Sequence, residues 1–159
     1  MSPDQGLAWD EVARRFGEAP TWWVATTGPN GPHSVPVWGV ICAARLHFYG
    51  HPTAVRSRNL AVDPRLVLHL DSGRSVLILN GTARPVGAAA DDPAVTAAYH
   101  AKYTHPTDAE FMPDAPHCAT SLMYAVTPDR AIAWDLYSGD TTSRHWRGIA
   151  NLPSTDPHD

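Results

Sequence analysis

Two arginines, Arg56 and Arg58, lie at the start of a short helix that the sequence predicts over about residues 54–62, with Thr53 as its expected N-cap. A cation in the first turn opposes the helix dipole, which favours negative charge at that end. The arrangement makes sense when an anion is bound, because arginine side chains and free helix amides both match phosphate. The pattern therefore predicts a phosphate-binding turn. The alternative is a solvated basic turn or an ion pair with Asp63.

A second candidate is the segment 32–39, which reads PHSVPVWG. Pro36 cannot donate a hydrogen bond to a neighbouring strand, so the strand is expected to be an edge, bulged or covered by a ligand at that point. Trp38 offers a flat, apolar wall. The segment predicts a place for a planar ligand, with ordinary core packing beside a bulge as the alternative.

The elements that must position these residues are short and separated by turn signals. Helices are expected at about 6–17, 54–62 and 92–103, and strands at 21–28, 33–42, 45–50, 65–71, 75–86, 121–127 and 131–137. The run Gly28-Pro29-Asn30-Gly31 predicts a type I turn with Gly31 in a left-handed conformation, and Pro128-Asp129 predicts the turn of a last hairpin. Short links between strands favour an antiparallel barrel over a parallel doubly wound sheet.

The composition excludes several classes of protein. The chain has 159 residues, of which 43% are hydrophobic, so it is neither disordered nor a disulfide-stapled miniprotein. With 18% charged residues and a net charge of −4 it is a poor nucleic-acid binder. Cys42 and Cys118 predict reduced thiols in a cytoplasmic protein. We expect no signal peptide or membrane span, one domain over 1–150 and a disordered polar tail at 151–159.

The remaining polar residues suggest no second chemistry. The nine histidines do not combine with cysteines or carboxylates at zinc spacing, so no metal is expected. No GxSxG motif is present, which argues against serine hydrolysis. We expect His33 to make a structural hydrogen bond, with a catalytic role as the alternative. No residue is identified as a catalytic acid or base.

Several segments, taken in order, resemble the split-barrel flavin and deazaflavin oxidoreductases related to pyridoxamine 5′-phosphate oxidase. The matching runs are WWVATTGPNGPHSVPVWG at 22–39, LHFYG at 46–50, RSRNLAVDPRLVLHL at 56–70, NGTA at 80–83 and YHAKY at 99–103. The resemblance implies a six-stranded antiparallel split β-barrel, a homodimer, and two cofactor sites at the subunit interface. The form is most similar to the actinobacterial branch that uses the deazaflavin coenzyme F-420.

The resemblance also implies site residues. Arg56, Arg58 and Asn59 look like the residues that hold the cofactor phosphate, and strand 34–38 looks like the one along the tricyclic ring. The C-terminal hairpin, with Trp134 and Trp146, looks like the part that reaches over the partner's cofactor. The expected cofactor-binding residues are Ser34, Val35, Pro36, Val37, Trp38, Phe48, Tyr49, Arg56, Arg58, Asn59, Trp134 and Trp146. A longer 104–119 loop departs from the family pattern.

The function that this resemblance implies is hydride transfer from coenzyme F-420 to an electron-poor double bond of an enone, a quinone or a tetrapyrrole. One alternative is an oxidoreductase that uses FMN, like pyridoxamine 5′-phosphate oxidase. The other is a flavin- or heme-binding protein without turnover. The expected partners are a second copy of the chain and a small-molecule substrate, with neither nucleic acid nor membrane.

Overall fold

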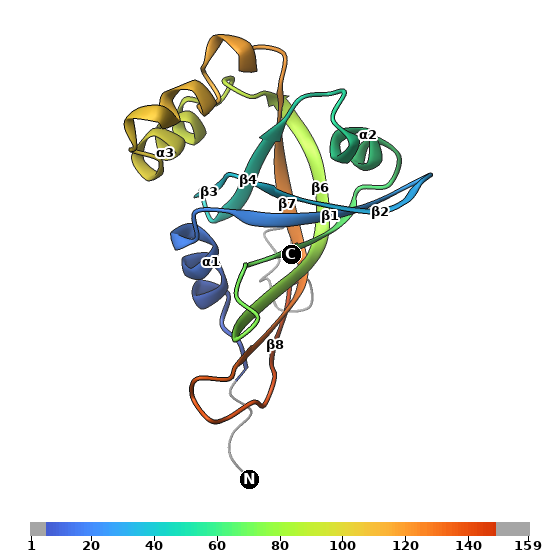
Figure 1. The fold of residues 1–159 in the computed structure, drawn as a ribbon, viewed down its shortest axis with the longest axis vertical. Coiled ribbons are helices and arrows are strands. Elements are labelled where there is room, and N and C mark those ends of the chain that lie inside the picture. Colours follow the sequence, from blue (N-terminus) through green and yellow to red (C-terminus); the bar gives the residue numbers. More distant parts are fainter. Residues whose placement is uncertain (1–5, 149–159) are drawn as a thin grey trace, which may run out of the picture.

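One curled antiparallel sheet forms the centre of the computed structural model, which describes residues 6–148 (Figure 1). The expected tail at 151–159 lies outside the described residues. The strands are β1 Trp22–Gly28, β2 Gly31–Val37, β3 Gly39–Cys42, β4 Arg45–Gly50, β5 Arg65–His69, β6 Ser75–Ala88, β7 Leu122–Asp135 and β8 Arg144–Arg147. The helices are α1 Trp9–Glu18, α2 Val55–Val62 and α3 Pro93–Lys102, followed by the 3-10 helices η1 Pro106–Phe111 and η2 Pro116–Cys118.

The order of strands explains how the sheet curls. It runs β2-β1-β5-β6-β7-β4-β3, with β8 paired to β7. The two strands that are neighbours in sequence, β2 and β3, therefore lie at opposite edges of the sheet, and only Trp38 stands between them. The sheet must curl to bring these edges together. This confirms the expected mainly antiparallel β fold and agrees with a split barrel, although the sheet has eight strands in the described residues where six were expected.

The predicted strand 33–42 is thus two strands, and Pro36 lies in an edge strand as one of its expected explanations requires. Pro36 pairs with Trp23 of β1, and β1 is the one strand that β2 pairs with in the sheet. The predicted turn is also confirmed, because Gly28 pairs with Gly31 and Gly31 has a φ of 101°.

The predicted last hairpin at 121–127 and 131–137 is wrong, because β7 runs through both segments as one strand of 14 residues. Asn80 pairs with Arg130 and Gly81 pairs with Pro128, so Asp129 bulges out of the ladder. The bulge accommodates a proline that has no N–H to donate. A Cβ atom on Gly81 would lie 2.4 Å from the Thr127 carbonyl oxygen, so glycine permits this close approach.

Two hydrophobic clusters make up the core. The larger one fills the inside of the curled sheet under α1 and includes Phe16, Trp22 and Phe48, each with no exposed surface. The smaller one packs α3 and the 104–119 segment against β3 and β4; its buried members are Val40, Val95, Tyr99, Tyr103, Met112 and Met123. Within the described part of the chain, no helix is long and apolar enough to cross a bilayer.

Candidate functional site

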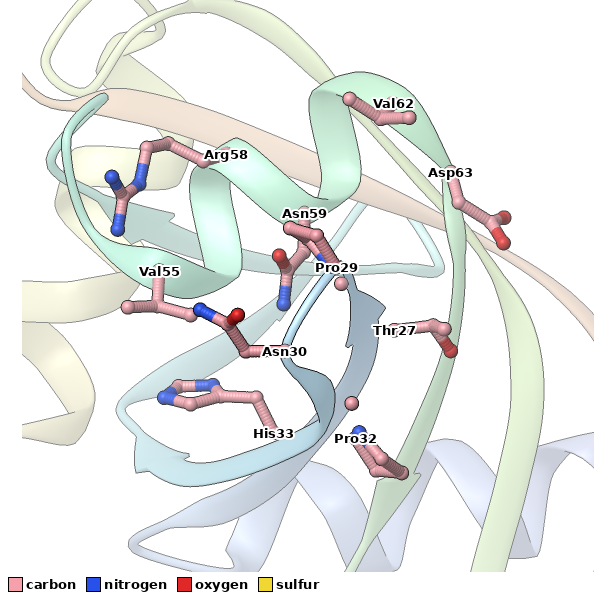
Figure 2. A pocket seen from close by; sticks show the side chains of 12 residues that line it. Thr27, Pro29, Asn30, Pro32, His33, Val55, Arg58, Asn59, Val62 and Asp63 are labelled. Atoms are coloured by element: carbon pink, nitrogen blue, oxygen red, sulfur yellow. The ribbon is translucent and has the colours of Figure 1, made fainter.

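Two grooves lie at successive positions along β2 and α2. We call the first, of about 820 Å³, the hairpin groove; its lining residues are Thr27, Gly28, Pro29, Asn30, Gly31, Pro32, His33, Val55, Arg58, Asn59, Val62 and Asp63 (Figure 2). We call the second, of about 380 Å³, the tryptophan groove; its lining residues are Thr21, Pro36, Val37, Trp38, Tyr49, Arg56 and Phe111. Both volumes lie within the range of small-molecule sites.

The indole of Trp38 forms a fixed wall of the tryptophan groove. One face of the indole stacks on the Tyr103 ring, with centroids 4.2 Å apart and planes 6° from parallel. The Phe111 ring meets Trp38 edge-on, with centroids 5.7 Å apart. The Trp38 carbonyl accepts a hydrogen bond of 3.1 Å from the Tyr99 hydroxyl. A side chain held in this way offers a planar ligand a rigid surface.

Arg56 brings a positive charge to this wall without a counter-charge from the described residues. Its guanidinium is half-buried and donates to the Tyr49 carbonyl over 3.3 Å, while its Nε atom is buried and has no hydrogen-bond partner. Among residues 6–148 no carboxylate lies within ion-pair distance of Arg56. Burial lowers the pKa of Arg56. A desolvated cation without a counter-ion is costly, so the geometry suits an anion.

The ion pair with Asp63, which was one alternative to a phosphate-binding turn, is not formed. Asp63 is held instead by Arg65, with an N–O distance of 2.7 Å. The prediction of Thr53 as N-cap is also wrong. The N-cap of α2 is Ala54, which supplies no side-chain hydrogen bond, and the Thr53 hydroxyl bonds to the His51 ring over 2.7 Å. The first turn of α2 is therefore left without a side-chain cap.

The structure does not bring Arg58 and Asn59 to the same place as Arg56. Arg58 is exposed and lines the hairpin groove, and its side chain leaves α2 in a different direction from that of Asn59 (Figure 2). Asn59 is 5% exposed, and its Nδ2 atom donates to the Thr26 hydroxyl over 3.1 Å. A Cβ atom on Gly28 would lie 2.1 Å from the Asn59 side-chain oxygen. Asn59 therefore fixes α2 against β1.

The other expected residues divide between the groove and the core. Pro36, Val37, Trp38 and Tyr49 line the tryptophan groove, whereas Ser34 and Val35, on the same strand, do not. Phe48 is completely buried and stacks on Tyr124, so its side chain packs the core and touches neither groove.

Trp134 and Trp146 line neither groove of their own protomer. The Trp146 ring packs against Trp9, with centroids 4.7 Å apart. Its strand, β8, lies at the end of the molecule away from α2 (Figure 1). The expected hydrogen bond of His33 is not made by Nδ1, which is buried and without a partner in the hairpin groove.

Sequence reasoning did not assign Phe111, Lys102 or Tyr103 to the site. Tyr99, Lys102 and Tyr103 follow the i, i+3, i+4 spacing of one helix face, which was a readable signal. Phe111 lies in a segment without periodicity, and no sequence signal identifies it. In the described part of the chain, no group of three or more His, Cys, Asp or Glu side chains is placed to hold a metal ion.

Comparisons with known proteins agree with this architecture. The sequence profile of the family described as pyridoxamine 5′-phosphate oxidase matches residues 8–135. A conserved hypothetical protein from Mycobacterium tuberculosis is a similar solved structure, with 19% identity, a TM-score of 0.66 and 98% coverage of both chains. A heme binding protein from Mycobacterium smegmatis has 20% identity and a TM-score of 0.66, covering 89% of this chain and 59% of its own.

A structure described as an F420 reductase has 19% identity and a TM-score of 0.53, covering 74% of this chain and 94% of its own. The comparison with curated proteins found no match. At these identities the solved structures show the fold alone. The family profile, in contrast, covers most of the sequence. The chain belongs to the pyridoxamine 5′-phosphate oxidase family.

Proposed function

We propose that this protein is an oxidoreductase that holds coenzyme F-420, a phosphorylated deazaflavin, in the tryptophan groove and transfers a hydride to an electron-poor double bond. The observation that carries the proposal is Arg56, a half-buried cation with an unpartnered Nε beside the flat wall of Trp38. An anion site next to a planar wall matches a phosphate joined to a ring system. Similarity to an F420 reductase and membership of the family support it.

In this proposal the chain binds and orients, and the coenzyme supplies the difficult chemistry. When bound, the reduced deazaflavin supplies a hydride from its ring carbon. Arg56 pairs with the phosphate, Trp38 sets the plane of the ring, and Phe111 shields the groove from water. Burial raises the pKa of Tyr49, whose hydroxyl donates to the Phe111 carbonyl, so this phenol stays neutral. The lining contains no carboxylate or imidazole, and we assign the proton to solvent.

The proposal includes the cellular setting and the assembly. We propose a homodimer in which the C-terminal hairpin with Trp134 and Trp146 reaches over the partner's groove. We place it in the cytoplasm, which the free thiols of Cys42 and Cys118 support. The substrate is a small molecule of the enone, quinone or tetrapyrrole type.

A parallel titration with coenzyme F-420, FMN and heme tests the cofactor. We expect coenzyme F-420 to bind tightest, measured by quenching of its fluorescence. Tighter binding of FMN would establish the flavin alternative, and a Soret band would establish heme binding.

The same titration tests Arg56. Because a hydrogen bond to a charged group is worth about 1.5–3 kcal/mol, Arg56→Ala should weaken coenzyme F-420 by roughly 10- to 150-fold. It should leave the phosphate-free deazaflavin core nearly unaffected. Arg58→Ala is the matched control, since Arg58 lines the other groove. Equal losses for both ligands would mean that Arg56 supports the fold and holds no phosphate.

A further inference from the structure

Lys102 is a half-buried cation that contacts no acidic side chain among the described residues. Its Nζ atom donates to the Gly39 carbonyl over 2.6 Å and to the Phe16 carbonyl over 3.4 Å. The same atom lies 5.3 Å from the Trp22 ring centroid and 5.2 Å from that of Tyr103. Two carbonyl oxygens and two aromatic faces thus surround the ammonium and replace part of the hydration that burial removes.

The Gly39 peptide, which Lys102 holds, follows directly after the Trp38 wall. The Gly39 N–H donates to the Tyr103 hydroxyl over 3.0 Å, and that hydroxyl donates to the Pro20 carbonyl over 2.8 Å. A Cβ atom on Gly39 would lie 2.2 Å from the Trp22 ring, so the Gly39 peptide is closely packed against this ring. Lys102 at the end of α3 and Tyr103 directly after it therefore bind the peptide at which the chain crosses from one edge of the sheet to the other.

We propose that Lys102 is a positioning residue, which orients the Trp38 indole for the ligand of the tryptophan groove by holding the Gly39 carbonyl. The inference rests on the proposed function for the identity of that ligand, while the contacts that carry it are present in the protein alone.

The burial of Lys102 argues against a purely stabilising role. Burial lowers the pKa of Lys102 to about 8, so the charged form is less favourable in the folded protein than in water. The Gly39 carbonyl also lies 3.1 Å from the Tyr103 hydroxyl, but that hydroxyl has one proton and lies closer to the Pro20 carbonyl, at 2.8 Å. A methionine at position 102 would keep the packing without a buried charge. The stability of the fold alone therefore does not require an ammonium here.

The same environment predicts a pH dependence. The elements packed around Lys102 present the Phe16 carbonyl from α1, the Trp22 ring from β1 and the Gly39 carbonyl from β3, and the residue that follows α3 presents the Tyr103 phenol. Of these groups only the Tyr103 phenol titrates, and burial raises its pKa to about 12. Affinity for the ring should therefore fall as the pH rises through about 8, where Lys102 loses its proton.

The test compares Lys102→Met with Lys102→Arg, which keeps the charge, and with Arg14→Met, which removes an exposed cation from α1. The measurements are amide hydrogen exchange at Gly39 without ligand, affinity for coenzyme F-420 at about pH 7 and about pH 9, and melting temperature. We expect Lys102→Met to melt no lower than the unmodified protein, to exchange faster at Gly39 and to bind roughly three- to tenfold more weakly, as for part of one charged hydrogen bond. Its affinity should no longer depend on pH in this range.

Lys102→Arg should retain most of the affinity. Arg14→Met should leave exchange at Gly39 and affinity unchanged and should lower the melting temperature only slightly, because it breaks an exposed pair with Glu18. Unchanged exchange at Gly39 in Lys102→Met would overturn the proposal, as would a loss of affinity that only follows a lower melting temperature. If the unmodified protein binds no coenzyme F-420, the proposed function fails, and exchange at Gly39 still decides the role of Lys102. If Lys102→Met does not fold, a stabilising role replaces the positioning role.

Discussion

Arg56 and Arg58 lie two residues apart on α2, yet one is half-buried in the tryptophan groove and the other is exposed in the hairpin groove. Their side chains diverge by roughly 200° on an ideal helix, so a common anion would have to lie beside the first turn. In the structure Arg56 turns inward, where a Cβ atom on Gly50 would lie 2.8 Å from its guanidinium, while Arg58 stays exposed. The sequence predicted that this turn binds an anion. It did not indicate which arginine is buried, because the packing of α2 decides that.

Asn59 is the residue at which a ligand-binding role and a structural role can be separated. Asn59→Ala leaves the buried Thr26 hydroxyl, 3% exposed, without the amide that donates to it. We expect a loss of about 1–3 kcal/mol in the free energy of unfolding, measured by urea denaturation. Arg58→Ala, one position earlier and exposed, should change it by no more than about 0.5 kcal/mol. A variant of Asn59 with normal stability and weak coenzyme binding would show instead that the amide contacts the phosphate.

At the scale of elements, the sequence predicted correctly those turns and helix starts that depend on residues close together in the chain. The predicted β1–β2 turn forms with Gly31 in the left-handed region, and α2 and α3 begin within a residue of their expected starts. The failure at Pro128-Asp129 has a tertiary cause. These residues have turn propensity, but β6 pairs with β7 on both sides of them and the Asp129 bulge absorbs the irregularity. The strand 33–42 divides at Trp38 for a similar reason, since the closure of the sheet places its halves at opposite edges.

The ion pair between α1 and β8 gives an element-scale prediction about pH. Arg144 donates to both Glu11 oxygens over 2.7 Å, and this hydrogen bonding holds the pKa of Glu11 below its usual value of 4.5. A lowered carboxyl pKa adds stability above the ordinary value, and that stability is lost as the pH falls through the folded pKa. Glu11→Gln should therefore lower the free energy of unfolding by about 1 kcal/mol at neutral pH.

The difference between Glu11→Gln and the unmodified protein should shrink as the pH drops below 4.5. Urea denaturation at several pH values measures it. Arg14→Gln, which breaks a more exposed pair with Glu18, is the matched comparison and should show a smaller effect. A constant difference at all pH values would mean that Glu11 stabilises by packing rather than by its charge.

At the scale of the whole molecule, the proposed site lies where the two edge strands of the curled sheet, β2 and β3, come together. Trp38 links these strands, Lys102 at the end of α3 binds the next peptide, and α2 supplies the Arg56 guanidinium. Segments far apart in the sequence thus make one groove. The groove remains open in the single chain. Val62 lines the hairpin groove and Phe111 lines the tryptophan groove, and they are exposed by 89% and 49%, so a second copy that covered the grooves would bury both. We therefore expect sedimentation to show a dimer.

A mixing experiment tests whether the C-terminal hairpin acts on the partner's groove. Arg56→Ala removes the anion partner within one protomer, and Trp146→Ala removes a side chain that packs against Trp9 in its own protomer. If Trp146 serves the partner, each mixed dimer has one groove with an intact Arg56 and an intact tryptophan from the other subunit. Random pairing makes about half of the dimers mixed, so about a quarter of the grooves should recover high affinity for coenzyme F-420. If Trp146 acts only within its own chain, no groove recovers, because every protomer then has one defect. Mixing either variant with itself is the control, and the fraction of tight sites in a titration is the measurement.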